Sequence, residues 1–276
     1  MKHELGIFVD ETGDLYAPCG KSGIENRFYA VSLVFHDKSI DVTRAISSLD
    51  ERLSHLSLPS VISEHAIHSY NLIRREYAYR DLTIRERKKI FSYMVDFLTC
   101  VHAQGVTVRT LLVDRSLYAK LDKDERGQAI LTELQHQMYE LLTTLGEQLF
   151  RFSEIKIYYD NGQSEISALL HKCFNQYKID DSIIERYDAH QCDYRLLQAS
   201  DMACTLTLLK AKQSHGTSFT HNDITFFNSK KGSNDAKQKI SNIIFATDKC
   251  FFGTTPPSTH SMERKVTLFL LNHSSS

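Results

Sequence analysis

Acidic side chains lie at the ends of two predicted strands and inside one predicted helix of this chain. Asp10 and Glu11 end the first apolar run, Asp160 ends a later one, and Asp201 lies within the apolar segment 196–209. Carboxylate oxygens are the ligands that Mg²⁺ and Mn²⁺ prefer. A divalent ion held by Asp10, Asp160 and Asp201 would activate water and stabilise the leaving oxygen of a phosphodiester. The pattern therefore predicts a metal site for phosphodiester cleavage.

The geometry of a strand separates the two neighbouring acids. Side chains alternate between the faces of a sheet, so Asp10 is expected on the face of Phe8 and Glu11 on the face of Val9. Only one of the two acids can then easily join a given cluster. Glu11 is nevertheless a catalytic candidate beside Asp10, whereas the predicted metal ligands are Asp10, Asp160 and Asp201. Acids at the carboxyl ends of strands, such as Asp160, lie where α/β sheets place their ligands. Asp10 and Asp160 can also be simple turn residues, because Asp is common in turns.

Asp201 is expected to be partly buried. It shares a helical face with Leu197, Cys204 and Leu208. A buried carboxylate needs a cation, a metal or a tight set of hydrogen bonds, because burial of an unpaired charge costs several kcal/mol. The alternative is an acid that interacts with the helix dipole. Its position about two turns after Tyr194 weakens that alternative.

Three further acids and two histidines are secondary candidates. Asp188 and Asp193 can be a fourth ligand or a partner of the ligands, whereas Asp114 is interpreted as a turn residue. His65 and His68 are spaced to share a helical face, and one of them can orient water or transfer a proton. We name His68 as the candidate, although the sequence does not decide between the two. The histidines lack the H-E-x-x-H zinc pattern, and a structural or surface role is the alternative for each.

The elements that position these residues follow from hydrophobic periodicity. Two strands joined by a loop predict an antiparallel start, and the later alternation of strands and helices predicts right-handed crossovers with parallel strands. An α/β fold with a mixed sheet flanked by helices results. The predicted strands are 5–10, 27–35, 106–113, 154–160 and 182–187, and the predicted helices are 41–56, 83–105, 125–150, 164–178 and 194–213.

Helix 83–105 has the clearest signals. Thr83 and Glu86 form a capping box at its start, and Gly105 ends it. The apolar residues predicted to face the core are Ile90, Phe91, Met94, Phe97, Leu98 and Val101.

The length and charge of the chain limit its domain organisation and the kinds of partner that it can bind. The chain has 276 residues, a formal charge of −1 and no linker before about residue 214. We predict one domain over 1–213 and a C-terminal extension over 214–276, packed on it or trailing from it, with a Lys-rich helix near 235–245. A near-neutral chain can bind a polyanion only through a local basic patch.

No apolar run approaches the ~20 residues that span a bilayer, and no signal peptide is visible. We expect a cytoplasmic protein with no membrane partner. The six cysteines are scattered and suggest neither disulfides nor a zinc site. The oligomeric state is not predicted.

Residues 74–89 supply the predicted nucleic-acid contact. Their cations can neutralise phosphates, and Tyr77 and Tyr79 can stack on exposed bases. The alternative is a solvated helix start with ion pairs along it. The predicted nucleic-acid-binding residues are Arg74, Arg75, Arg80, Arg85 and Lys88.

Two motifs resemble the DUF3800 family. Residues 8–14, Phe-Val-Asp-Glu-Thr-Gly-Asp, are similar to its Asp-Glu-Ser-Gly opening, and residues 197–201, Leu-Gln-Ala-Ser-Asp, to its Leu-Gln-x-Ala-Asp motif. Thr12 and Ser200 depart from the family pattern but leave the acids in place. The resemblance covers roughly residues 5–212. It implies an RNase H-like fold in which Asp10, Asp160 and Asp201 match clustered metal-binding acids of a presumed nuclease.

The leading functional hypothesis is therefore a nuclease dependent on Mg²⁺ or Mn²⁺, with a DNA or RNA substrate. One alternative is a non-catalytic nucleic-acid-binding or regulatory module with the same fold. A phosphatase or other phosphoryl hydrolase that uses the same metal chemistry on a small molecule is a third hypothesis.

Overall fold

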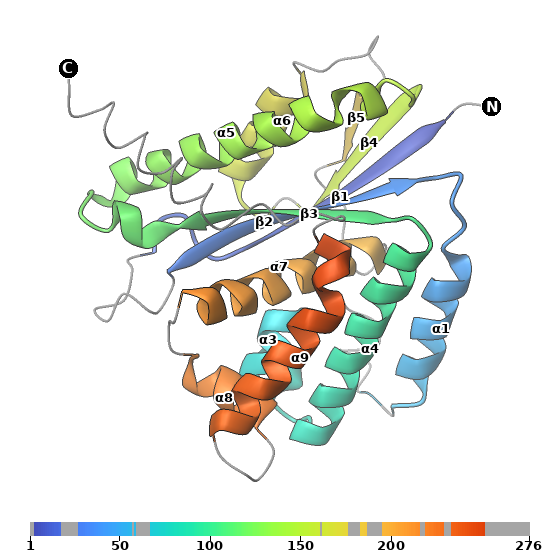
Figure 1. Ribbon diagram of the computed structural model, residues 1–276, viewed down its shortest axis with the longest axis vertical. Coiled ribbons are helices and arrows are strands. Elements are labelled where there is room, and N and C mark those ends of the chain that lie inside the picture. The colour runs from blue at the N-terminus through green and yellow to red at the C-terminus, as the bar shows by residue number, and fades with distance from the viewer. Residues whose placement is uncertain are drawn as a thin grey trace.

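A mixed β-sheet with helices on both faces forms the centre of the protein (Figure 1). The computed structural model describes residues 3–17, 27–56, 58, 67–160, 162–175, 183–186, 195–215, 219–228 and 233–251. The strands of this sheet, in chain order, are β1 (Glu4–Thr12), β2 (Phe28–Asp37), β3 (Thr107–Asp114), β4 (Glu154–Tyr159) and β5 (Ile183–Arg186).

The order of the strands across the sheet is β3-β2-β1-β4-β5. β1 pairs antiparallel with β2, and β2 pairs antiparallel with β3. β4 runs parallel to both β1 and β5. The antiparallel start, the partly parallel sheet and the α/β class predicted from the sequence are thereby confirmed.

Two groups of helices cover the two faces of the sheet (Figure 1). α5 and α6 lie on one face, and α7 lies on the other with the remaining helices around and beyond it. Two short 3₁₀ helices are η1 (Tyr77–Tyr79) and η2 (Arg115–Tyr118). The α-helices are α1 (Thr43–Ser54), α3 (Ser69–Arg74), α4 (Ile84–Ala103), α5 (Lys123–Leu149), α6 (Ser164–Asn175), α7 (Arg195–Ser214), α8 (His221–Phe227) and α9 (Ser233–Phe251).

Strand alternation divides the core between these faces. Ile7 and Val9 of β1 point into the cluster that contains the buried stripe of α5, whereas Phe8 points into the cluster on the α7 side. Burying each such apolar side chain contributes about 1.5–3 kcal/mol, so a shift of the strand by one residue would be strongly disfavoured. The buried stripe of α5 is Ile130, Leu134, Met138 and Leu142.

α4 forms as the sequence predicts. The Thr83 backbone N–H donates to Glu86 Oε2 at 2.8 Å, and the Glu86 N–H donates to Thr83 Oγ1 at 3.3 Å. Gly105 follows the helix with φ of +112°, a conformation that favours glycine. All six residues of the predicted apolar stripe are buried.

α7 is the helix that carries Asp201 into the centre of the molecule. It packs across β1 and β2 and also contacts α4 and α9. Ala199 and Ala203 are fully buried, which lets the helix lie close to its neighbours. Because α7 is covered on several sides, a polar residue in its middle must find its partners within the protein.

α8 and α9 contribute to the same core. Phe226 and Phe227 of α8 each meet the ring of Phe91 of α4 edge to face, and Ala236 and Ile240 of α9 are fully buried. Among the described residues, no helix combines the length and the apolar character that crossing a bilayer requires.

Candidate metal centre

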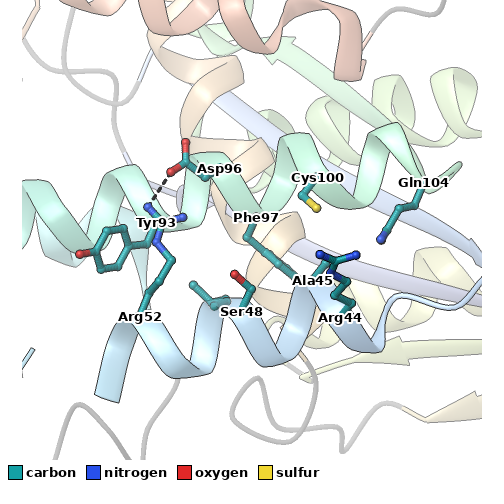
Figure 2. Close-up of a pocket in the computed structure, with 10 residues that line it drawn as sticks. Arg44, Ala45, Ser48, Arg52, Tyr93, Asp96, Phe97, Cys100 and Gln104 are labelled. Carbon is teal, nitrogen blue, oxygen red and sulfur yellow. Dashed lines mark hydrogen bonds and ion pairs between the residues drawn. The ribbon is translucent and has the colours of Figure 1, made fainter. Parts of the chain in front are cut away.

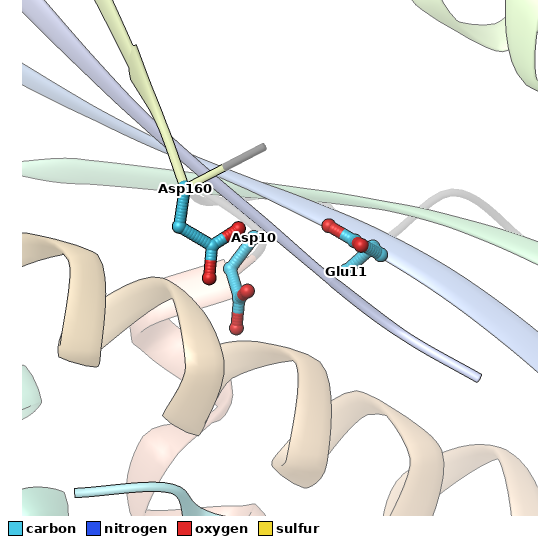
Figure 3. Close-up of side chains that lie close together, drawn as sticks. All are labelled: Asp10, Glu11 and Asp160. Atoms are coloured by element: carbon cyan, nitrogen blue, oxygen red, sulfur yellow. The ribbon is translucent and has the colours of Figure 1, made fainter. Parts of the chain in front are cut away.

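The carboxyl ends of β1 and β4 bring Asp10 and Asp160 together. The last residue pair of their parallel ladder is Val9 with Tyr159, and each aspartate is the next residue in the chain: Asp10 still within β1, Asp160 directly after β4. Both side chains point toward α7 (Figure 3). Two acids separated by 150 positions in the chain thus lie side by side at one edge of the sheet.

Glu11 joins the same group. Figure 3 shows its carboxylate across β1 from that of Asp10, as strand alternation requires. Nevertheless, one oxygen from each of Asp10, Glu11 and Asp160 lies within 4.8 Å of the other two. The expectation that alternation would keep one of the neighbouring acids out of the cluster was wrong. The ladder between β1 and β4 stops at Val9 and Tyr159, so β4 no longer pairs with β1 beside Asp10 and Glu11, and their carboxylates can approach Asp160 from both faces.

The turn after β4 explains how Glu11 reaches the group. The Gly162 N–H donates to Asp160 Oδ1 at 3.2 Å. A Cβ placed on Gly162 would lie 2.6 Å from Glu11 Oε1 and 3.4 Å from Asp160 Oδ1. Because Gly162 has no Cβ, the carboxylates of both Glu11 and Asp160 can lie against this turn.

Glu11 is held in a largely buried polar environment. Gln163 Nε2 donates to Glu11 Oε1 at 3.3 Å, whereas the buried Oε2 has no hydrogen-bond partner among the described residues. Burial raises the pKa of Glu11 to about 7, although hydrogen bonds from Tyr159 and Gln163 act in the opposite direction. A buried carboxylate oxygen with no protein partner is suited to a bound cation.

Asp10 is buried among the other carboxylates of this group. Only 5% of the surface of Asp10 is exposed. Burial raises the pKa of Asp10 well above its ordinary range, and the nearby carboxylates of Asp201, Glu11 and Asp160 raise it further. A divalent cation would favour the charged form of all these acids. The donor set therefore fits Mg²⁺ or Mn²⁺, the ions predicted from the sequence.

Asp201 is buried, as the sequence predicts, with 8% of the residue exposed. Its Oδ1 accepts the Ser69 N–H at 2.8 Å, and its Oδ2 lies 3.6 Å from His68 Nδ1. In the described part of the chain, only Asp10, Glu11 and Asp160 meet the 4.8 Å spacing. Asp201 thus lies beside the acid group, close enough to raise the pKa of Asp10.

His68 precedes α3 and is not part of a helical face. Its backbone is extended, with φ of −97° and ψ of 110°, so the prediction that His68 shares a helical face with His65 is wrong at His68. His65 itself lies outside the described residues. The Asp201 carboxylate, 3.6 Å from Nδ1, raises the pKa of His68, against burial, which lowers it.

The predicted nucleic-acid-binding residues divide into two groups. Arg74, Arg75, Arg80 and Arg85 are exposed. Lys88 instead donates to the backbone oxygen of Asn228 at 2.8 Å. This bond directs the ammonium group of Lys88 to α8, so its predicted phosphate contact needs that bond to break.

The two tyrosines of the basic segment also differ. Tyr77 is 74% exposed, whereas Tyr79 is only 3% exposed, and its hydroxyl accepts the His68 N–H at 2.9 Å. Tyr79 therefore cannot stack on a base as predicted. Part of the segment fits the alternative prediction of a solvated segment with ion pairs along it, because Arg74 Nε pairs with Glu76 at 3.0 Å.

Asp114, at the end of β3, is the turn residue that the sequence predicts. It forms an ion pair of 2.6 Å with Arg27, and its Oδ1 accepts the Ser116 N–H. Asp188 and Asp193, the other secondary candidates, lie outside the described residues.

Sequence reasoning missed the neighbours that shape the group. Gln163 and Tyr159 surround Glu11, and Ser69 binds Asp201 through its backbone. The Asp-Asn-Gly-Gln run at 160–163 signals a turn, but a turn signal does not show which distant acid the turn meets. A backbone donor such as the Ser69 N–H has no sequence signal.

A groove between α1 and α4 has a volume of about 420 Å³ (Figure 2). Arg52 crosses it, paired with Asp96 at 2.7 Å and stacked 3.9 Å from the centre of the Tyr93 ring. None of the acids of the candidate metal centre lines this groove.

Comparison with known proteins adds no assignment. No model of a known protein family matches this chain, and no curated protein matches it. The resemblance to DUF3800 stays a prediction.

Proposed function

We propose that this protein is a nuclease that hydrolyses phosphodiester bonds with a divalent cation, Mg²⁺ or Mn²⁺. The observation that carries the proposal is the meeting of one oxygen each from Asp10, Glu11 and Asp160 within 4.8 Å. This group lies at the carboxyl edge of parallel strands, where α/β proteins commonly bind their ligands.

The fold supports the same proposal. A mixed sheet of order β3-β2-β1-β4-β5, in which only β2 is reversed, agrees with the RNase H-like fold that the DUF3800 resemblance implies. The acids implied by that resemblance, Asp10, Asp160 and Asp201, come from β1, the end of β4, and α7. Fold alone does not define function. The proposed activity therefore depends on the acids Asp10, Glu11 and Asp160.

The residues have distinct parts in the proposed reaction. Asp10, Asp160 and Glu11 would hold the cation, which supplies an activated water and stabilises charge on the phosphate. Burial excludes water from Asp10 and strengthens the interaction of these carboxylates with a cation. His68, with 43% of its side chain exposed, lies where a substrate can reach it.

The exposed arginines offer a path for the substrate. α3 has six residues and leads from His68 to Arg74 and Arg75, a span of about 9 Å at 1.5 Å per residue. Phosphates bound by these arginines would continue a strand whose cleaved bond lies at the acids. The overall charge of −1 requires such a local patch.

The direct test is cleavage of labelled single- and double-stranded DNA and RNA with Mg²⁺ or Mn²⁺. We expect cleavage that excess chelator stops and that Asp10→Asn and Asp160→Asn remove. Cleavage that persists in chelator would contradict the proposal. Binding without cleavage, unchanged in Asp160→Asn, would instead indicate a non-catalytic nucleic-acid-binding module.

A further inference from the structure

We propose that Asp201 is a positioning residue that holds His68 and the first turn of α3 beside the metal centre, and that it is not one of the metal's ligands. The proposal deepens the proposed function and rests on it in one respect, namely that the cation is bound by Asp10, Glu11 and Asp160.

The two carboxylate oxygens of Asp201 both contact the start of α3. Oδ1 accepts the Ser69 N–H at 2.8 Å, and Oδ2 lies 3.6 Å from His68 Nδ1. Both oxygens are thus engaged with consecutive residues at the start of α3. Asp201 is also outside the group of described acids whose oxygens lie within 4.8 Å of one another.

His68 is held from two sides. Its backbone N–H donates to the hydroxyl of the buried Tyr79 at 2.9 Å. The next residue, Ser69, is fully buried, with its hydroxyl 3.8 Å from Met202 Sδ on α7. These contacts hold the start of α3 against α7, and Asp201 supplies the charged contact between the two.

The position of Asp201 also bears on the imidazole ring of His68. With Nδ1 toward Asp201, the nitrogen left for a ligand is Nε2, and a carboxylate on one ring nitrogen sets which nitrogen carries the proton. The side chain is 43% exposed, and within the described residues Nε2 makes no hydrogen bond. His68 would therefore present Nε2 to a substrate phosphate or to water near Asp160, whose charge also acts on the ring.

The experiment separates metal binding from positioning. Mn²⁺ affinity is measured by electron paramagnetic resonance for the wild type and for Asp160→Asn, Asp201→Asn and His68→Gln. We expect Asp160→Asn to weaken Mn²⁺ binding by at least about tenfold, because it removes a charged ligand, and the other two variants to stay within twofold of the wild type. A loss in Asp201→Asn equal to that in Asp160→Asn would overturn the proposal.

A spectroscopic measurement reports on His68 itself. The ¹⁵N imidazole signals of His68, assigned by their absence in His68→Gln, should show a defined protonated nitrogen at Nδ1 in the wild type and a mixture of tautomers in Asp201→Asn. Unchanged signals would overturn the proposal. This result holds even if the wild type binds no Mn²⁺, which would contradict the proposed function alone.

Kinetics with an oligonucleotide complete the test. A misplaced group can cost about 10²-fold in rate, so Asp201→Asn and His68→Gln should each lower kcat to that extent and leave KM within twofold. The double variant should lose no more than either single variant, because the two residues act as a unit. Additive losses would contradict this coupling, and His68→Gln keeps the test valid if Asp201→Asn folds poorly.

Asp223→Asn is the matched control. Asp223 is also a buried helical aspartate that accepts a backbone N–H, from Thr220 at 2.9 Å, but its cation is Lys212 at 2.7 Å. Its replacement should lower stability while leaving Mn²⁺ affinity and the His68 signals unchanged.

Discussion

β3 ends in Asp114 and β4 is followed directly by Asp160, and the two aspartates have different surroundings. Asp114 at the end of β3 meets the guanidinium of Arg27 at 2.6 Å and the Ser116 N–H. Asp160 at the end of β4 meets the carboxylates of Asp10 and Glu11. At the β3 end a cation neutralises the acid, whereas beside β4 the neighbouring acids raise the pKa of Asp10, and Asp160 also raises that of Glu11.

The place of each strand in the sheet accounts for the difference. Among the described strands, β3 pairs only with β2, and it presents Asp114 opposite Phe28, beside Arg27. β4 lies next to β1, whose own carboxyl end carries Asp10 and Glu11. An aspartate at the end of a strand therefore becomes a candidate ligand through the acids of its neighbouring strand and not through its own sequence.

The largest expected effect is on cleavage. Asp160→Asn should lower kcat by at least ~10²-fold, because it removes a carboxylate on which charge stabilisation in the reaction depends. Asp114→Asn should leave kcat within about twofold. Rates with a labelled oligonucleotide in Mg²⁺ measure both. Equal losses in the two variants would remove the functional distinction between the strand ends.

The next effect is stabilisation by the cation. At 100 times its dissociation constant, Mn²⁺ should stabilise the folded wild type by about 2.7 kcal/mol. Asp114→Asn should keep this gain in chemical unfolding, and Asp160→Asn should lose most of it. No change of wild-type stability with Mn²⁺ would indicate that the acids at the β1 and β4 ends do not form a cation site.

A smaller effect is expected from the turn after β4. In Gly162→Ala the new Cβ would approach Glu11 Oε1, the mobile end of a long side chain, so the fold should persist while that carboxylate moves. We expect Mn²⁺ to bind about threefold to tenfold more weakly, up to ~1.4 kcal/mol. Gly146→Ala, where a Cβ would meet nothing within 4 Å, is the control. Unchanged affinity in Gly162→Ala would exclude Glu11 from the ligands.

The smallest effect is on stability at the β3 end. Burial alone would raise the pKa of Asp114, but hydrogen bonds from Arg27 and Ser116 and the charge of Arg27 bring it below the ordinary 3.8. A lowered pKa means that this stabilisation is present above about pH 4 and is lost as the pH falls through the folded-state value.

Asp114→Asn should therefore cost roughly 1 kcal/mol at pH 7, since the pair is partly exposed. Its stability relative to the wild type should recover at pH 2–3. Urea unfolding at both pH values measures the difference. A loss of equal size at pH 7 and at pH 2 would show that the carboxylate charge of Asp114 is not what stabilises this end.

Much of the fold was predictable because its signals are local. The capping box at Thr83 and the glycine at 105 defined α4, and strand alternation placed Phe8 and Val9 on opposite faces. The burial of Asp201 also followed from its apolar helical neighbours. Each of these inferences uses contacts between residues a few positions apart, which the sequence pattern contains directly.

The site was predictable only in part. Asp10 and Asp160 were named as ligands from their strand ends. Glu11 was named only as a catalytic candidate and not as a ligand, and the burial of Tyr79 was not foreseen. Both depend on where separate segments meet. Periodicity places a side chain on a face of its own element, and it contains nothing about what lies opposite.

The sequence alone shows which residues are acids, which elements carry them and which face of each element is apolar. The packing of the elements then brings the ends of β1 and β4 side by side, pairs Arg27 with Asp114, and places Asp201 at the start of α3. The cause is a difference in range. The capping and periodicity signals of helices and strands come from residues close together in the chain, whereas the partners of these carboxylates are distant, 87 positions away for Arg27 and Asp114 and 132 for Ser69 and Asp201.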